Sequence, residues 1–184
     1  MSFLLPGHNL MIVAHPDDET IFGYTQLITK NSDWTVLCIT NAGNAERRTE
    51  FQKVLSTVYC IPWTIWNYED RWGAPIDLDC EDSLVDFLVH EKYDHVVTHN
   101  EAGEYGHSQH ASLHQLVKAL VPSNLFVFEK SARPLPFTVL QDKMRVLELY
   151  QSQHSLNAWD WYDPNRPSES LMSYIVHEDL RQIA

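Results

Sequence analysis

The sequence has few of the features that mark secreted or membrane-spanning proteins. It contains only three cysteines, Cys38, Cys60 and Cys80, and no CxxC pair. Free thiols in a reducing compartment are therefore expected, rather than a disulfide framework or a cysteine-based zinc ribbon. No apolar run approaches the roughly 20 residues that span a bilayer, and residues 1–10 lack the basic region of a secretory signal. We expect a cytoplasmic protein without a membrane span.

Basic residues are also scarce. The chain has 13 lysines and arginines against 25 acidic residues, a formal net charge of -12. This excess of negative charge argues against nucleic acid as a partner. A hydrophobic fraction of 44% and a charged fraction of 21% are typical of a globular protein. With no internal repeat or flexible linker, residues 1–184 are expected to form one domain, with a less regular segment at 154–184. The oligomeric state is not fixed by the sequence.

Short apolar runs alternate with amphipathic segments along the chain. This alternation predicts an α/β fold, a three-layer α/β/α sandwich with a mainly parallel, Rossmann-like sheet. Ligands bind beyond the carboxyl ends of the strands in such sheets, so the site is expected in the loops there. Strands are expected at 11–14, 34–40, 64–67, 94–99, 125–130 and 137–140, and helices at 18–30, 45–59, 81–93, 110–120 and 141–152.

The first of these loops carries the sequence AHPDDE, residues 14–19. His15 and Asp18 are three residues apart across a strand-to-helix turn, so their side chains can converge on one point. Asp17 lies between them and can face the same space without being a ligand. A second interpretation is that the three acids simply cap a surface helix, where the helix dipole favours them. For Glu19 this remains our interpretation.

The loop GEYGHSQHASLH, residues 103–114, also follows a predicted strand. It contains His107, His110 and His114, and we interpret His114 as an ordinary helix residue. His99, which ends the preceding strand, is a further candidate near the same edge of the sheet.

Together the two loops predict a metal site. His15, Asp18 and one histidine of the second loop would form a set of two histidines and one carboxylate with an open position. Catalytic zinc has such ligand sets, and so does non-haem iron. Asp17 is then the candidate general base, and His107 the candidate group that stabilises an oxyanion.

These motifs resemble those of the PIG-L/LmbE family of zinc-dependent N-deacetylases. The resemblance begins with AHPDDE after a first strand and a later GHxxH that opens a helix. It extends from about residue 10 to residue 153. Further matches are the loop ITNAGN, the Arg-x-x-Glu of Arg47 and Glu50, the acid Asp70 in WNYEDR, and the helix that begins at Lys143 and ends in Ser-Gln.

The resemblance implies a hydrolase that removes the N-acetyl group from an N-acetylglucosamine-type sugar or glycoconjugate substrate. Ser108 and Gln109 stand where many bacterial members have Pro and Asp. We expect no membrane anchor of the kind that the eukaryotic members have, which disfavours a lipid-linked substrate. The resemblance implies that His15, Asp18 and His110 are the ligands of Zn2+ (or Fe2+). It implies that Asp17 is the general base and that His107 stabilises the oxyanion. Arg47 and Asp70 would then contact the sugar.

Two alternative functions remain at this point. One is an amidase of the same fold that cleaves a different sugar-linked amide. The other is a catalytically inactive glycan-binding module. The C-terminal aromatic residues Trp159, Trp161, Tyr162 and Tyr174 are interpreted as closing a core rather than stacking on sugar rings.

Overall fold

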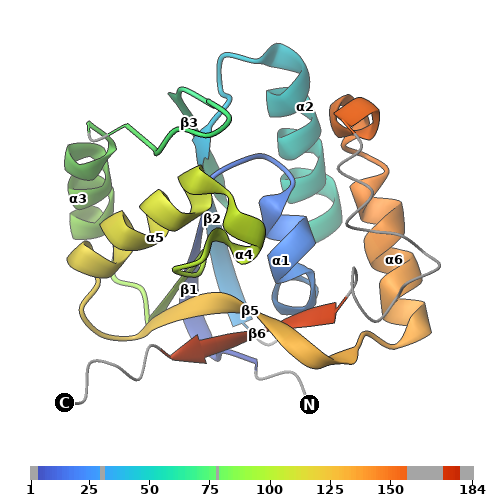
Figure 1. Ribbon diagram of the computed structural model, residues 1–184. Coiled ribbons are helices and arrows are strands. Elements are labelled where there is room, and N and C mark those ends of the chain that lie inside the picture. The colour runs from blue at the N-terminus through green and yellow to red at the C-terminus, as the bar shows by residue number, and fades with distance from the viewer. Residues whose placement is uncertain (1–3, 30–31, 78, 157–171, 179–184) are drawn as a thin grey trace.

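A six-stranded sheet forms the centre of the protein (Figure 1). The computed structural model describes residues 4–29, 32–77, 79–156 and 172–178. Strands β1 to β5 run parallel and β6 is antiparallel to β5, in the order β3-β2-β1-β4-β5-β6. The predicted mainly parallel sheet is confirmed. The strands are β1 (Gly7–Val13), β2 (Ser32–Thr40), β3 (Trp63–Tyr68), β4 (His95–Thr98), β5 (Leu125–Pro134) and β6 (Met172–Glu178).

Helices cover both faces of the sheet, as Figure 1 shows. One face carries α1 (Asp18–Leu27), α2 (Ala45–Lys53) with its π-helical continuation η1 (Val54–Tyr59), and α6 (Phe137–Leu147). The other face carries α3 (Cys80–His90) and α5 (Ser108–Leu120). The short helix α4 (Gly103–Gly106) precedes α5, and the 3-10 helix η2 (Gln151–Leu156) follows α6. None of these described helices is long and apolar enough to cross a membrane.

Alternation along β1 separates the two hydrophobic cores. Met11 and Val13 belong to the core with α1, α2 and α6. Leu10, Ile12 and Ala14 belong to the core with α3 and α5. Successive side chains of a strand point to opposite faces, and all five are fully buried. An uninterrupted apolar run is therefore what a central parallel strand with two covered faces requires.

The strand order places the crevice of the sheet between β1 and β4. From β1 the chain proceeds outward through β2 to β3, then returns to the opposite side of β1 as β4. The hydroxyl of Thr98 donates a hydrogen bond of 2.9 Å to the carbonyl of Ile12, which joins the carboxyl ends of the two strands. The loops that follow β1 and β4 consequently open beside each other, at the position where parallel α/β sheets bind ligands.

The structure corrects the prediction at residues 137–140. The sequence FTVL was expected to be a strand, but it forms the first turn of α6, directly after Pro136. Val139, Leu140 and Met144 pack against the core at helical spacing, and this tertiary packing outweighs the strand preference of the β-branched residues.

Within the C-terminal segment, Met172–Glu178 form β6. Tyr174 lies in β6. Trp159, Trp161 and Tyr162 lie outside the described residues.

Lys143 is a buried lysine between α6 and α1. It is 3% exposed, and its ammonium group donates a hydrogen bond to the carbonyl of Ile21. Burial lowers the pKa of Lys143 to about 7, because water no longer solvates the charge. An unfolded lysine has a pKa of about 10.4. Between these two pKa values the unfolded chain binds more protons than the folded chain, so the stability of the fold rises with pH. The buried Lys143 therefore destabilises the fold most below pH 7 and least near pH 10.

Replacing this amine should stabilise the protein in a pH-dependent way. We expect Lys143→Met to raise the free energy of unfolding by about 2 to 4 kcal/mol at pH 6, with the gain shrinking towards pH 10. Urea unfolding at several pH values measures the difference. The exposed Lys53→Met is the control and should show no such pH dependence. A constant difference between parent and Lys143→Met would contradict the prediction.

Candidate metal centre

The residues predicted for the site meet in the crevice between β1 and β4. His15, Asp17 and Asp18 come from the turn between β1 and α1, and His107 and His110 from the segment that opens α5. All five are buried, with exposed fractions of 9% or less. The structure thus brings the two loops together, although about ninety residues separate them.

Three ligand-type atoms lie at nearly equal distances from one another. His15 Nδ1 is 3.2 Å from Asp18 Oδ2 and 3.2 Å from His110 Nε2. His110 Nε2 is 3.3 Å from Asp18 Oδ2. Nitrogen and oxygen ligands about 2.0 Å from a tetrahedral zinc ion are separated by about 3.3 Å. The spacing of this group is therefore that of one face of a metal coordination tetrahedron.

The protonation of His15 follows from its neighbour Gln109. The Gln109 amide nitrogen donates to the Glu69 carbonyl at 2.8 Å, which fixes the amide orientation. Gln109 Oε1 then lies 2.8 Å from His15 Nε2. An amide oxygen can only accept, so His15 Nε2 carries the proton in this contact. The Nδ1 atom of neutral His15 therefore points its lone pair at Asp18 and His110.

A similar argument applies to His110. Its Nδ1 lies 2.7 Å from Glu104 Oε2, and the pKa of Glu104 is about 2, because the neighbouring His99 and His110 outweigh the opposing effect of burial. The ionised carboxylate accepts the Nδ1 proton, which leaves the Nε2 lone pair facing Asp18. Two imidazole lone pairs and one carboxylate oxygen then face one another. The residues present fit a divalent metal ion, which neutralises this repulsion.

Without a metal ion, a proton competes for the same space. Burial alone would lower the pKa of His15, but hydrogen bonds to Asp18 and Asp70 outweigh it and raise the pKa to about 10. Because a metal ligand must be deprotonated, metal binding at this group would release a proton.

His99 lies beside the group but is less suited to bind metal. Its Nε2 is 3.4 Å from Asp18 Oδ2, and Asp18, His99 and His110 could also be grouped around a metal ion. However, the backbone N–H of Ala14 donates to His99 Nε2 at 3.0 Å, which occupies that lone pair. His114, interpreted from the sequence as an ordinary helix residue, contacts the His99 carbonyl through Nδ1 at 2.9 Å.

Asp17 has an unusual backbone conformation and a side chain that does not cap the helix. Its φ is 107° and ψ is -28°, and the side chain makes no capping hydrogen bond to α1. Its Oδ1 lies 3.6 Å from the Arg47 guanidinium. Burial raises the pKa of Asp17 well above the usual range, with Arg47 opposing the rise. A raised pKa makes the Asp17 carboxylate a stronger base than an ordinary aspartate.

His107 stacks on His110 with a centroid separation of 4.4 Å. Burial, together with the neighbouring His110 and His15, lowers the pKa of His107 to about 4, so its imidazole is neutral at pH 7. Its buried Nδ1 has no hydrogen-bond partner among the described residues. Trp72 is 85% exposed and its ring lies 5.0 Å from that of His107, edge to face. An unpartnered buried nitrogen beside an exposed aromatic ring is the arrangement of a site that receives a ligand.

Arg47 and Asp70 form the rim of the centre. The Arg47 guanidinium contacts Asp70 at 2.9 Å and donates to the Pro16 carbonyl at 2.9 Å. Burial would raise the pKa of Asp70, but hydrogen bonding from His15 and the charge of Arg47 hold it well below the usual range. Asp70 also borders a pocket of about 420 Å³, lined by Asn41, Asn44, Asn67, Tyr68, Glu69 and Asp70.

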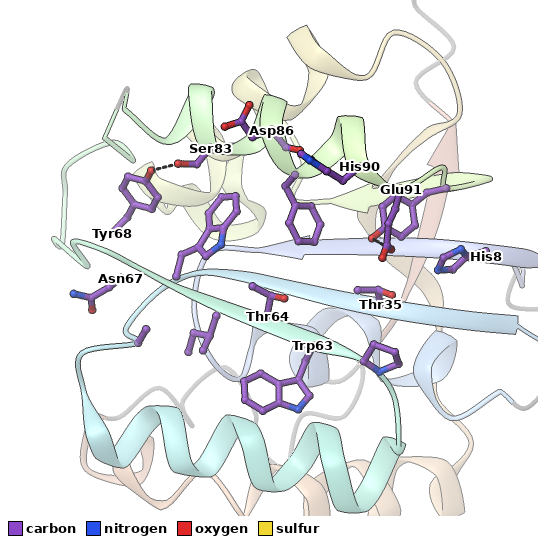
Figure 2. Close-up of a pocket in the computed structure, with 16 residues that line it drawn as sticks. His8, Thr35, Trp63, Thr64, Asn67, Tyr68, Ser83, Asp86, His90 and Glu91 are labelled. Carbon is purple, nitrogen blue, oxygen red and sulfur yellow. Dashed lines mark hydrogen bonds between the residues drawn. The ribbon is translucent and has the colours of Figure 1, made fainter.

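A larger groove lies away from the metal-ligand group. It measures about 1120 Å³ and is lined by β3, α3 and their neighbours (Figure 2). Among its lining residues, the Tyr68 hydroxyl and Ser83 share a hydrogen bond of 2.6 Å (Figure 2). The groove shares Asn67 and Tyr68 with the smaller pocket, but none of the seven predicted site residues lines it. The buried ionisable groups, rather than the size of the groove, identify the centre.

Glu19 supports the turn that carries Asp17. Its Oε2 accepts the Asp17 backbone N–H at 3.1 Å, as a helix-start acid would. The sequence does not reveal that Glu19 is fully buried. Its Oε1 accepts hydrogen bonds of 2.5 Å from Thr20 and from Tyr150, which follows α6. Glu19 therefore joins the turn that carries His15 and Asp18 to the C-terminal part of the chain.

Sequence reasoning missed three residues of the centre. It did not assign a role to Glu104, an orienting role to Gln109, or a position beside His107 to Trp72. The only sequence signals were an acid and an amide close to the histidines, and a tryptophan in a loop next to glycine. Their partners become visible only when the loops are brought together.

Both the sequence and the fold match known proteins. The family model for GlcNAc-PI de-N-acetylase (PIG-L) matches residues 10–121. The uncharacterized protein L374 of Acanthamoeba polyphaga mimivirus is 37% identical over 166 residues, which cover 80% of this chain and 72% of the viral protein.

Two solved structures share the fold. The conserved protein TT1542 from Thermus thermophilus has a TM-score of 0.63 at 16% identity, over 90% of this chain and 93% of its own. A deacetylase of teicoplanin biosynthesis, solved as a complex with teicoplanin, has a TM-score of 0.65 at 12% identity, over 94% of this chain and 99% of its own.

The hydrogen bond from Tyr150 to Glu19 should contribute measurably to stability. We expect Tyr150→Phe to lower the free energy of unfolding by about 1 to 3 kcal/mol, because the buried carboxylate loses a donor. Tyr93→Phe is the matched control, since its hydroxyl donates to the exposed Glu91, and a change below about 0.5 kcal/mol is expected. Equal losses in the two variants, measured by urea unfolding, would contradict this account.

Proposed function

The chain belongs to the PIG-L family of GlcNAc-PI de-N-acetylases, a family of deacetylase-type hydrolases, and we propose that it removes the N-acetyl group from an N-acetylglucosamine-type sugar or glycoconjugate with a bound zinc ion. The observation that carries the proposal is the approach of two imidazole lone pairs and one carboxylate oxygen to within 3.2–3.3 Å of one another. A divalent cation bound between these three acceptors would neutralise their mutual repulsion, which supports the proposal.

In the proposed centre, His15, Asp18 and His110 hold the metal ion. When bound, zinc supplies positive charge that acidifies water and polarises the acetamide carbonyl. Iron(II) suits the same set of two histidines and one carboxylate.

Asp17 then acts as the general base. It takes a proton from the attacking water while the water oxygen bonds to the acetamide carbon. Neutral His107 donates a hydrogen bond to the carbonyl oxygen as that oxygen gains negative charge. When the carbon–nitrogen bond breaks, Asp17 returns its proton to the departing amine. The products are acetate and the free amino sugar.

Polar and aromatic groups around the centre suit a sugar substrate. Asp70, with a side chain 31% exposed, can accept hydrogen bonds from sugar hydroxyls in the 420 Å³ pocket that it borders. Arg47 holds Asp70 and lies near Asp17, which couples the sugar side of the site to the general base. Trp72 offers an apolar face beside His107. We propose that these three residues contact or position the sugar.

The reaction is tested by assaying acetate and free amine after incubation of the zinc-loaded protein with N-acetylglucosamine conjugates. Asp17→Asn should lose at least about 100-fold in kcat, because general base catalysis contributes about 10²–10⁴-fold, yet retain one equivalent of zinc. His15→Ala should lose both activity and zinc. Exposed Asp33→Asn is the control for the charge change. Full activity in either Asp17→Asn or His15→Ala would overturn the assignment.

Trp72 tests the location of the substrate. We expect Trp72→Ala to raise KM about threefold to tenfold, since an aromatic contact contributes about 0.5–1.5 kcal/mol, with little change in kcat or zinc content. Phe137→Ala is the matched control, because Phe137 is also exposed (71%) but starts α6. An unchanged KM in Trp72→Ala would remove this residue from the substrate site.

A further inference from the structure

Glu104 is a buried carboxylate shared by two histidines. Its Oε2 lies 2.7 Å from His110 Nδ1 and 3.0 Å from His99 Nδ1. Its Oε1 accepts the backbone N–H of Asn100 at 2.9 Å. The side chain is 1% exposed, so water does not supply alternative partners. Both carboxylate oxygens therefore act as acceptors in well-defined hydrogen bonds.

Through His99 the contacts of Glu104 extend to the other loop of the metal centre. His99 Nδ1 donates to Glu104, which leaves His99 Nε2 to accept the Ala14 N–H at 3.0 Å. Ala14 directly precedes His15. One carboxylate thus orients His110 at the start of α5 and, through His99, holds the end of β1 next to His15.

The backbone at Glu104 also indicates a functional constraint. Its φ is 55° and ψ is -60°, in a region that residues with a side chain rarely adopt. Its N–H donates to Asn100 Oδ1 at 3.1 Å, which together with the Asn100 N–H contact holds the strained turn closed. Glycine would adopt this conformation more easily. A strained backbone conformation persists only where the surrounding structure holds it, and such residues cluster at functional sites.

We propose that Glu104 is a positioning residue of the metal centre: its carboxylate holds His110 and His99 with their protons on Nδ1, so that the Nε2 lone pair of His110 faces the metal ion. This inference rests on the metal centre of the proposed function and is independent of the sugar substrate. A carboxylate behind a metal-binding histidine fixes the ring and raises its basicity, and the loss of such a partner costs about 10–100-fold in metal affinity.

Glutamine cannot replace this carboxylate. A carboxylate accepts on both oxygens, whereas an amide accepts on one and donates from the other. If the NH2 group of Glu104→Gln faces the imidazoles, it meets two N–H groups. If it faces Asn100, it meets the backbone N–H. In either orientation at least one buried donor loses its acceptor.

The experiment compares the zinc affinity of the full-length parent, Glu104→Gln and Glu148→Gln by competition with a chromogenic chelator. Glu104→Gln should bind zinc about 10–100-fold more weakly. Glu148→Gln, which changes an exposed glutamate at the end of α6, should bind as the parent does. Equal affinity in all three proteins would overturn the role of Glu104. A parent protein that binds no zinc would instead refute the metal centre itself.

A second measurement starts with the parent protein, and that part of it does not depend on the folding of the variant. Nitrogen-15 NMR of the imidazoles in the metal-free parent distinguishes the Nδ1–H and Nε2–H forms at pH values where the rings are neutral. The proposal requires the Nδ1–H form for both His110 and His99. In Glu104→Gln, His110 should shift towards the Nε2–H form, which a purely structural role would not produce. An Nε2–H form of His110 in the parent would overturn the proposal.

Discussion

The mutual approach of His15, Asp18 and His110 is the constraint on which the rest of the centre depends. Atoms that carry lone pairs repel at 3.2–3.3 Å unless a cation lies between them. In the proposed metal-bound state each imidazole presents its unprotonated nitrogen, and a separate acceptor holds its proton. Gln109 provides this acceptor for one ring and Glu104 for the other. The parallel sheet contributes by opening both loops at the crevice between β1 and β4, so that short contacts can form between segments far apart in sequence.

Backbone strain is concentrated where these loops leave the sheet. Among the described residues, five other than glycine have positive φ, and three of them lie in the loops after β1, β2 and β4: Asp17, Asn41 and Glu104. At Asp17 the unusual turn directs the carboxylate away from the helix N–H groups that an acid at this position normally caps. Asn41 donates to both Thr40 and Asp70. Strain of this kind costs about 1–3 kcal/mol per residue, and the buried bonds of Glu19 to Tyr150 and Thr20 offset part of it near Asp17.

The sequence predicts most of the fold and the location of the centre, but not how the histidines are oriented. Continuous apolar runs such as MIVA predict central strands, because a strand whose two faces are both covered has no side that faces water. The strand expected at 137–140 is wrong. Local β-branched composition cannot show that Val139 and Leu140 pack against the core from one face of a helix. The roles of Glu104 and Gln109 depend on which acceptor faces which nitrogen. That property arises from contacts between loops, and no local pattern encodes it.

The amide at position 109 has an electrostatic consequence for the proposed base. Asp17 already lies near Asp18 and Glu19, whose charges raise its pKa, while Arg47 and His15 oppose the rise. A carboxylate at position 109 would also accept the His15 proton, but it would add a negative charge beside the ligand set. The neutral amide of Gln109 accepts the same proton without that charge, and its other end is fixed by the Glu69 carbonyl. The ring is thus held without a further rise in the pKa of Asp17, and such a rise would disfavour the ionised form that the proposed general base needs.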